Sequence, residues 1–209
     1  MDGARCPEPA EGPGVLPFVW RAPLPRSLSF IPPMMPTLID KPPVRGEWAV
    51  EVKWDGWRCQ IIIDSEVVRI FTRRGHDWTK KLRIIADAAA SELKVKSAII
   101  DGELVYPHDS GRSDFAALQA VVRSHSDRLI FMAFDILHHN GEDTRRMPLE
   151  ERRERLQALI GAGGRIHNTA RHWRVPLRRS LPLLKGWTSK ASFASAEGRS
   201  IGAGMPSTG

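Results

Sequence analysis

The sequence has 209 residues, 42% of them hydrophobic, and a formal net charge of +7 at pH 7. This length suits one domain of ordinary size, and the hydrophobic fraction is sufficient for a buried core, which argues against a disordered or fibrous chain. The two cysteines, Cys6 and Cys59, suggest neither a disulfide framework nor a cysteine-rich zinc site, as expected in a reducing cytoplasm. Residues 1–14 lack the pattern of a secretion signal, and no apolar run approaches the roughly 18 residues of a membrane span, so we expect no membrane partner.

The first predicted elements are an extended lead-in and three strands. Residues 1–45 contain most of the prolines, which favours extended or loop structure over helix. From Trp48 to Trp54 apolar and charged residues alternate, which predicts a strand with one buried face. The apolar runs 59–63 and 67–71 are separated by three polar residues, so we predict a hairpin.

A helix, a strand and a second helix are predicted next. Apolar residues at helical spacing predict a helix over 79–93, with Asp77 or Thr79 as its cap. The strand predicted over 98–106 places Asp101 and Glu103 on one face, because side chains two positions apart on a strand point the same way. A short helix is predicted from about residue 113 to 122, with Phe115, Leu118 and Val122 facing inward.

The last regular elements end near residue 160. The run 129–137 is nearly all apolar and suits a strand that is buried on both faces. Asn140-Gly141 then predicts a turn, and Pro148 opens a helix whose apolar side is Leu149, Leu156 and Ile160. Strands that follow one another with helices between them predict an α+β fold.

The positive charge is concentrated after this point. Residues 161–209 contain eight basic residues and one acid, Glu197, whereas the other 160 residues contain 23 of each sign. Periodicity also stops there, so we expect a basic, low-complexity, poorly ordered tail. Such a tail could bind DNA phosphates without sequence preference, and a solvated segment without a ligand is the alternative.

The stretch from Glu51 to Arg58 carries the strongest indication of chemistry. Glu51, Lys53 and Asp55 share one strand face, and Gly56 and Arg58 follow directly. Three charges on one face indicate a ligand site, in which burial and a nucleotide-bound metal would help the lysine amine to act as a nucleophile. The alternative is an exposed strand with ion pairs along it.

The order of motifs resembles that of the covalent nucleotidyltransferases, which comprise DNA ligases, RNA ligases and mRNA capping enzymes. Lys53 to Arg58 is similar to their Lys-x-Asp-Gly-x-Arg motif. Three further matches follow in the family's order, namely Thr72-Arg73-Arg74-Gly75, Asp101-Gly102-Glu103 and the aromatic motif Phe134-Asp135-Ile136-Leu137. The lead-in PMMPTLIDKPP and the Asn-Gly turn after the aromatic motif are similar to the ligase module of bacterial ligase D, an enzyme of double-strand break end joining.

This resemblance implies an adenylation domain of the DNA ligase type, with antiparallel sheets flanked by helices and ATP between them. Lys53 would attack the α-phosphorus of ATP, expel pyrophosphate and become lysyl-AMP. The implied ATP-binding residues are Glu51 at the adenine amino group, Asp55 and Gly56 in the motif loop, Arg58 and Arg73 at ribose and phosphate, Glu103 at the ribose, and Phe134 stacked on adenine.

The resemblance also implies cofactors and partners. Mg²⁺ or Mn²⁺ would accompany ATP, with Glu103 as its protein ligand and Asp101 as a second candidate. The partners would be nicked or broken duplex DNA and end-joining proteins in a bacterial cytoplasm, and the reaction would serve DNA repair and recombination. Each site residue has a plain structural alternative: Asp101 could end a strand, Phe134 could be core, and Arg73 and Arg74 could form a solvated hairpin end.

The resemblance covers residues 30–160 and is incomplete after them. Active members continue with a Glu-Gly-x-Val-x-Lys motif, a lysine-containing strand and an OB-fold domain, and the nearest match here is Glu197-Gly198-Arg199-Ser200. We therefore expect a Pro/Gly-rich segment at 1–29, an incomplete adenylation domain without the OB fold at 30–160, and a tail at 161–209 that has left the ancestral reading frame. Loss of these phosphate-binding groups would suppress adenylation by several orders of magnitude and leave weak or no sealing.

Two other functions remain open from the sequence. An RNA ligase or capping enzyme shares the lysine motif, although the lead-in and the context of Phe134 favour a DNA ligase. A non-catalytic remnant that binds ATP or DNA is the third reading.

Overall fold

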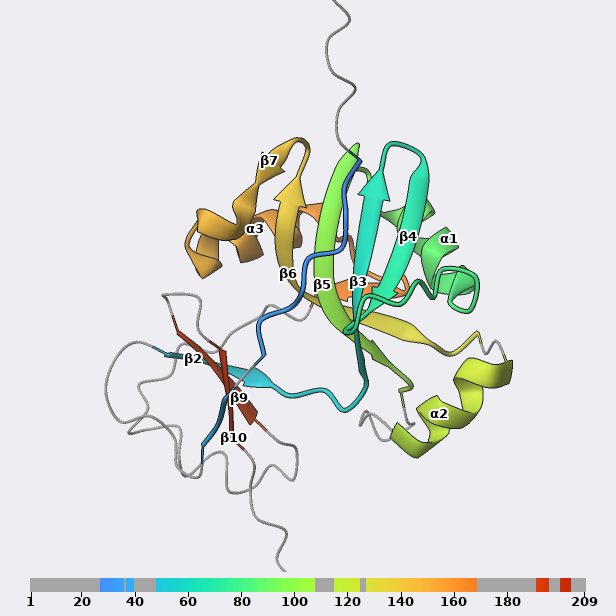
Figure 1. The fold of residues 1–209 in the computed structure, drawn as a ribbon, viewed down its shortest axis with the longest axis horizontal. Coiled ribbons are helices and arrows are strands. Elements are labelled where there is room, and N and C mark those ends of the chain that lie inside the picture. Colours follow the sequence, from blue (N-terminus) through green and yellow to red (C-terminus); the bar gives the residue numbers. More distant parts are fainter. Residues whose placement is uncertain are drawn as a thin grey trace, which may run out of the picture.

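The computed structural model contains two β-sheets and three α-helices in the part of the chain that it describes (Figure 1). The described residues are 27–35, 53–107, 115–124 and 127–168, together with the backbone of four strands at 37–39, 48–52, 191–195 and 200–203. The larger sheet has the order β4-β3-β5-β6-β7, with β8 paired to β6, and the smaller has the order β1-β10-β9-β2.

The hairpin of β3 (Trp57–Asp64) and β4 (Val67–Thr72) forms one edge of the larger sheet. Asp64 pairs with Val67 at its tip, where Ser65 has a positive φ of 57°. β5 (Ser97–Val105) runs antiparallel to β3 over eight residue pairs. The hairpin predicted from two apolar runs and the strand predicted over 98–106 are confirmed.

β6 (Ile130–His139) completes the centre of this sheet, and the predicted Asn-Gly turn follows it. Asn140 and Gly141 have φ angles of 48° and 93°, the left-handed values that a tight hairpin of this kind needs. β7 (Glu142–Asp143) then pairs with the end of β6. β8 (Ile166–Asn168) pairs with β6 in parallel, so the sheet is mixed rather than purely antiparallel.

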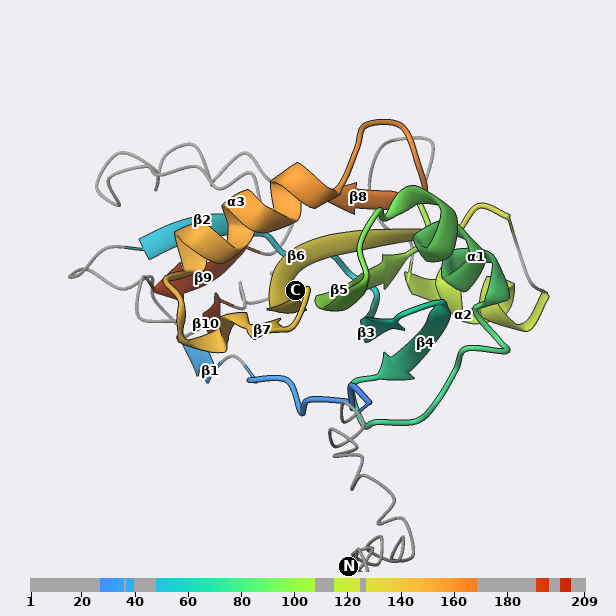
Figure 2. The ribbon, with the colours of Figure 1, turned by 90° about the horizontal axis from the view of Figure 1, so that it is seen from above.

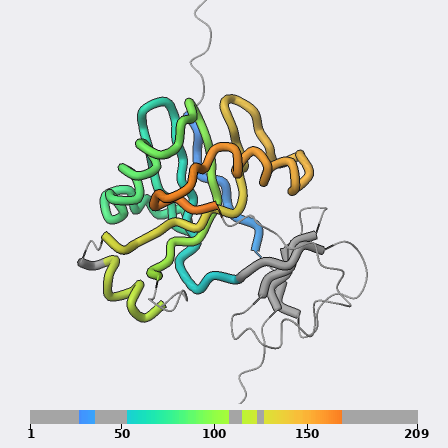
Figure 3. Tube along the Cα trace, turned by 180° about the vertical axis from the view of Figure 1, so that it is seen from behind, coloured from blue at the N-terminus to red at the C-terminus, as the bar shows by residue number. Residues whose placement is uncertain are grey.

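Helices α1 (Arg83–Glu92) and α3 (Leu149–Leu159) lie on the same side of the larger sheet (Figures 2 and 3). The helix predicted from residue 79 begins only at Arg83. Thr79 binds the carboxylate of Asp77 and accepts a hydrogen bond from the backbone N–H of Ile70 in β4. These two residues therefore form a turn that is tied to the sheet, and they do not cap the helix.

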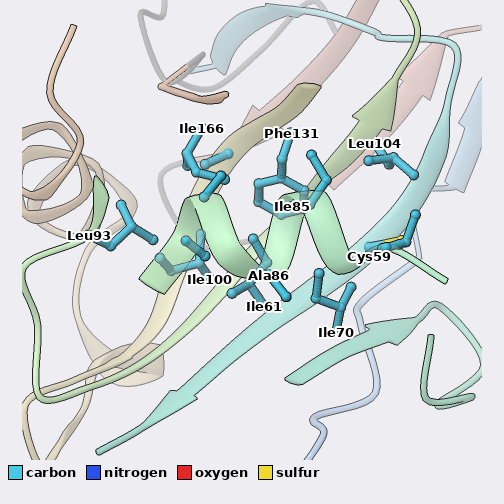
Figure 4. Packing of buried hydrophobic residues seen from close by; sticks show 14 of the residues in the cluster. Cys59, Ile61, Ile70, Ile85, Ala86, Leu93, Ile100, Leu104, Phe131 and Ile166 are labelled. Carbon is cyan, nitrogen blue, oxygen red and sulfur yellow. The ribbon is translucent and has the colours of Figure 1, made fainter. Parts of the chain in front are cut away.

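The core lies between these helices and the sheet (Figure 4). Alternate residues of the strands face it, because side chains on a strand point to opposite faces in turn. The members with less than 2% of their surface exposed include Ile61, Ile70, Leu82, Ile85, Ile100, Leu104, Leu118, Phe131, Ile136 and Leu156. α2 (Phe115–Ser124) contributes Leu118 and Val122 to this core, as predicted. The prediction that Phe115 also faces inward is wrong, because this residue at the start of the helix is 42% exposed.

Residues 27–35 cross the opposite side of the larger sheet (Figure 2). The side-chain amide of Gln60 accepts from the backbone N–H of Ile31 at 2.9 Å and donates to its carbonyl at 3.0 Å. Asp64 accepts from the N–H of Leu28, and Arg69 donates to the Leu28 carbonyl. The lead-in is extended as predicted, and these bonds from the hairpin hold it in place.

The smaller sheet joins segments from both ends of the chain. β1 (Thr37–Ile39) pairs in parallel with β10 (Ser200–Ala203), and β9 (Ala191–Ser195) pairs with both β10 and β2 (Trp48–Val52). Three strands, β8 to β10, thus lie within residues 161–209. The sequence pattern had predicted no regular element in this region. No helix in the described part of the chain is long and apolar enough to cross a membrane.

Candidate active site

The face of the larger sheet that lies away from α1 carries the charged residues of the predicted motifs. Arg58 of β3 lies opposite Glu103 of β5, and Gln60 lies opposite Asp101. The prediction that Asp101 and Glu103 share a face is confirmed by this register, because Arg58 and Gln60 are two positions apart on β3. Both carboxylates also act on Arg58, where burial lowers the pKa and the carboxylates raise it to a value above its ordinary one. Strand pairing therefore assembles two of the motifs before any ligand is present.

Arg58 is the centre of this polar face. Its Nε and Nη2 donate to the two carboxylate oxygens of Asp101 at 3.2 and 2.8 Å, and its Nη1 donates to the carbonyl of Met34 at 2.9 Å. The guanidinium also lies 5.4 Å from the ring centroid of Phe134, within the range of a cation–π contact. One arginine thus connects the lead-in, β5 and β6.

Glu103 is held in a setting that favours its neutral form. Burial raises its pKa to about 7, although Lys53 and Arg58 oppose that shift and the N–H of Gly56 donates to the carboxylate. A carboxyl group whose pKa is moved this far from its ordinary value is typical of functional sites. The electrostatic influence of Lys53 on Glu103 also shows that the motif lysine lies near this carboxylate.

Two motif glycines are required by close approach. A Cβ on Gly56 would lie 2.2 Å from the Leu104 carbonyl oxygen, and one on Gly102 would lie 2.4 Å from the Phe131 ring. Neither position can hold a side chain without displacement of backbone or core atoms. The glycine of each motif is therefore explained by packing between the segment after β2 and the strands β5 and β6.

Lys53 follows directly after β2 and remains accessible. Its Nζ lies 3.3 Å from Asp55 Oδ1, and 41% of the lysine side chain is exposed. A nucleophile that reacts with a dissolved nucleotide needs such access. Glu51 lies in β2, where only the backbone is described, so its predicted place at adenine lies outside the described side chains.

Phe134 is placed by a β-bulge. Gly102 pairs with Ala133 and Asp101 pairs with Asp135, which leaves Phe134 as the extra residue on β6. A bulge of this kind redirects a side chain. The Phe134 ring is half-buried beside Arg58. In this it differs from Phe131, which is fully buried on the core face.

Arg73 and Arg74 lie in the turn that ends β4. The backbone N–H of Arg73 donates to the carbonyl of Arg58, and Gly75, with φ of 79°, closes the turn against the Phe30 ring. Both arginine side chains are exposed. The turn thus places Arg73 beside the polar face, whereas its side chain projects into solvent.

The two acidic residues differ as metal ligands. Each Asp101 oxygen accepts a hydrogen bond from Arg58, so this carboxylate is already paired with a cation. Within the described residues, no group of three or more His, Cys, Asp or Glu side chains could hold a metal. A metal held here would need most of its ligands from phosphate and water, with Glu103 as the available protein carboxylate.

Several residues of this face were not predicted from the sequence. Gln60 is 2% exposed and anchors the lead-in, while Arg152 is 7% exposed and binds Asp135. The alternation of β3 could have placed Gln60 beside Arg58. Arg152 lies in a helix whose Glu/Arg pairs predicted an exposed face, so no local feature marked it.

The arrangement of this face defines the class of protein: an α+β nucleotidyltransferase domain with a lysine beside a cluster of arginine, carboxylate and aromatic side chains. Residues 38–176 match the family model "ATP dependent DNA ligase domain". The chain belongs to this family, which confirms the resemblance of its motifs.

Relatives and solved structures agree with this assignment. The chain is 44% identical over 132 residues to the Multifunctional non-homologous end joining protein LigD of Pseudomonas aeruginosa, a match that covers 63% of this chain and 16% of the relative. It is 32% identical over 143 residues to the Bifunctional non-homologous end joining protein LigD of Bacillus subtilis, covering 62% of this chain and 23% of the relative. The chain therefore spans less than a quarter of the length of these two relatives.

The fold is similar to that of the ligase domain of Mycobacterium tuberculosis LigD, with a TM-score of 0.59 at 24% identity, over 75% of this chain and 51% of the other. A mycobacterial DNA ligase D solved in complex with ATP and MES gives a TM-score of 0.62 at 20% identity, over 80% and 59% of the two chains. These similarities show the fold.

Proposed function

We propose that this chain is the adenylation domain of an ATP-dependent DNA ligase, in which Lys53 takes AMP from ATP for the sealing of breaks in DNA repair and recombination. The observation that carries the proposal is the polar face itself. Arg58, Glu103 and Phe134 come from three strands and lie together on one face of the sheet, and Lys53 is near enough to influence Glu103 electrostatically.

The chemical step is a substitution at phosphorus. The unprotonated amine of Lys53 attacks the α-phosphorus, a P–N bond forms, the bond to the pyrophosphate oxygen breaks, and the nitrogen releases one proton. The charge that develops on the phosphate oxygens is stabilised by nearby cations, and positioning supplies much of the remaining rate. Arg58 is already oriented by Asp101 and Met34, so little reorganisation is needed when a nucleotide binds.

The other site residues have complementary roles in this proposal. Phe134 stacks on adenine and Glu51 accepts a hydrogen bond from its amino group. Arg73 reaches ribose or phosphate from its exposed turn, while Asp55 and Gly56 shape the loop beside Lys53. Glu103 binds the ribose or the Mg²⁺ or Mn²⁺ ion that accompanies ATP, and Asp101 orients Arg58.

The proposed partner is a nicked or broken DNA duplex, and two relatives are named for non-homologous end joining. The same similarity supports end-joining proteins as further partners and a bacterial cytoplasmic location. The Glu-Gly-x-Val-x-Lys motif of active members has no match in residues 161–209. We therefore expect the 209-residue chain by itself to seal nicks weakly or not at all.

Incubation with α-labelled ATP and Mg²⁺ tests the proposal. Label retained on the denatured wild-type chain and absent from Lys53→Ala is the expected result. Equal label on both proteins would contradict the role of Lys53, and no label on either would favour a non-catalytic remnant that binds ATP or DNA.

An RNA ligase or capping enzyme is the second candidate, because it shares the lysine chemistry. Transfer of the label to nicked duplex DNA, nicked RNA and 5′-diphosphate RNA ends separates the classes. We expect transfer to the DNA substrate to exceed transfer to both RNA substrates.

A further inference from the structure

The bulge that presents Phe134 is braced from helix α3. Phe134 is the extra residue between two regular pairs, Gly102 with Ala133 and Asp101 with Asp135. Because a bulge interrupts the regular ladder, the direction of its side chain depends on how the flanking residues are fixed. The structure shows what fixes the residue on the C-terminal side.

Asp135, directly after Phe134, is bound by Arg152 of α3 through two parallel hydrogen bonds. Arg152 Nε donates to Asp135 Oδ1 at 2.8 Å and Nη2 donates to Oδ2 at 2.9 Å, while Nη1 donates to the Met147 carbonyl at 2.7 Å. Only 8% of the Arg152 side chain and 17% of the Asp135 side chain are exposed. A bidentate pair that is this buried has one preferred geometry.

The pair also reaches the backbone of β6. Asp135 Oδ1 accepts a hydrogen bond from the N–H of Ile136 at 2.9 Å, in addition to the one from Arg152. The carboxylate that Arg152 orients is thus the group that supports the backbone just beyond the bulge. A change at Arg152 would be felt at Phe134, two residues before Ile136.

The Asp135–Arg152 ion pair also neutralises one of two carboxylates that lie opposite each other in the sheet. Asp135 lies opposite Asp101 across β5 and β6, an arrangement that destabilises a sheet when both charges are unpaired. Each carboxylate has its own arginine, Arg58 for Asp101 and Arg152 for Asp135. These four residues form an ion-pair row that runs from α3 to the centre of the candidate site.

We propose that Arg152 is a positioning residue of the adenylation site, which acts through Asp135 to hold Phe134 and Arg58 in the arrangement that receives the nucleotide. This inference rests on the proposed function and adds to it a residue of α3 in the ion-pair row. Without Arg152, Asp135 is a buried carboxylate that competes with Asp101 for Arg58 and no longer braces the bulge.

The expected kinetic effect is specific. The brace acts mainly on Phe134, while Arg58 keeps its hydrogen bonds to Asp101 and Met34. Stacking of Phe134 on adenine acts alike in the bound substrate and in the transition state, so its loss raises KM and leaves kcat nearly unchanged. For Arg152→Met, which keeps the volume and removes the charge, we expect KM for ATP in self-adenylation to rise about tenfold while the rate at saturation changes less than about twofold. Asp135→Asn in the Arg152→Met protein should recover much of this loss, because the amide keeps an acceptor for Ile136 without a competing charge.

Two matched variants control for stability and charge. Arg155→Met removes another arginine of α3 whose partners are Glu142 and Glu151, and Ile160→Val thins the core beside the helix. Both should leave KM at the wild-type value. The thermal unfolding midpoint and the dissociation constant of a fluorescent ATP analogue are measured for each protein.

The outcomes separate the two proposals. If the wild type is adenylated and Arg152→Met lowers only the unfolding midpoint, with KM and analogue binding unchanged, Arg152 is purely structural and the inference is wrong. If the wild type binds the analogue without adenylation, the proposed function fails, and weaker binding by Arg152→Met alone still supports the positioning role. A wild type that binds no nucleotide overturns both.

Discussion

The two faces of the larger sheet carry different chemistry, although the same strands build both. On β3, Cys59, Ile61 and Ile63 point into the core beneath α1, whereas Arg58 and Gln60 bind the lead-in and β5 on the opposite side. A strand can do this because its side chains alternate. The core face is filled by apolar contacts, and the polar face is filled by paired charges and hydrogen bonds.

This difference indicates how stability and chemistry are divided in the molecule. Apolar burial is the main favourable term in folding, so the core face should dominate the free energy of unfolding. The polar face places charges where a nucleotide can use them, and each ion pair there offsets the cost of burial without adding much stability. Substitutions on the two faces should therefore separate folding from adenylation.

The largest expected effect on stability is on the core face. Phe131 is fully buried and packs against Gly102, so Phe131→Ala removes a ring and leaves a cavity. We expect the free energy of unfolding to fall by about 4 kcal/mol in urea titrations. Adenylation per folded molecule should change little, and an equal loss in both measurements would break the division between faces.

A smaller loss is expected from the polar face. Arg58→Met leaves the Asp101 carboxylate, which is 5% exposed, without its bidentate partner. We expect about 3 kcal/mol less stability at pH 7 and a marked loss of adenylation. Asp101→Asn in the same protein should restore most of the stability but not the adenylation; recovery of both would mean that Arg58 serves the fold alone.

The pH dependence of stability tests the environment of Glu103. Burial raises its folded-state pKa from 4.5 to about 7, so between these values the folded protein holds a proton that the unfolded chain has lost. Stability from this group is present at low pH and is lost as pH rises toward 7. At about 1.4 kcal/mol per pKa unit, reduced for partial exposure, the wild type should lose about 2 kcal/mol more than Glu103→Gln over this range. Parallel pH profiles for the two proteins would show that Glu103 is not in this environment.

The smallest effect is expected away from both faces. Arg83 and Asp87 form an exposed ion pair along α1, with 75% and 62% of their side chains exposed. Arg83→Ala should change the free energy of unfolding by less than about 0.5 kcal/mol and leave adenylation unchanged. A larger change in stability or adenylation would show that removal of any charge has these effects, whether or not the charge lies on the polar face.

The sequence predicted what depends on neighbours along the chain. Two apolar runs located the hairpin of β3 and β4, and alternation along the next strand placed Asp101 with Glu103, because both patterns are local properties of the chain. The Asn140-Gly141 turn was predicted for the same reason, since its residue types permit the left-handed backbone that the turn requires. Lys53, Arg58 and the other site residues were selected by the order of motifs, and their roles remain predictions.

Features set by tertiary contact were not predicted. The bulge at Phe134 arises from a shift between β5 and β6, and the Asp135–Arg152 pair joins residues 17 positions apart. A charged helix such as α3 gives an exposed pattern even when one arginine is buried against a distant carboxylate. The strands within residues 161–209 escaped detection because short pieces of low periodicity acquire strand structure only through their partners in a sheet.

A structure of the chain with an ATP analogue that cannot be cleaved between the α- and β-phosphates tests the central claim most directly. The account predicts adenine against Phe134, the ribose and phosphates near Arg58 and Glu103, and the α-phosphorus in line with the Lys53 amine. A nucleotide bound elsewhere, with this amine still directed into solvent beside Asp55, would contradict it.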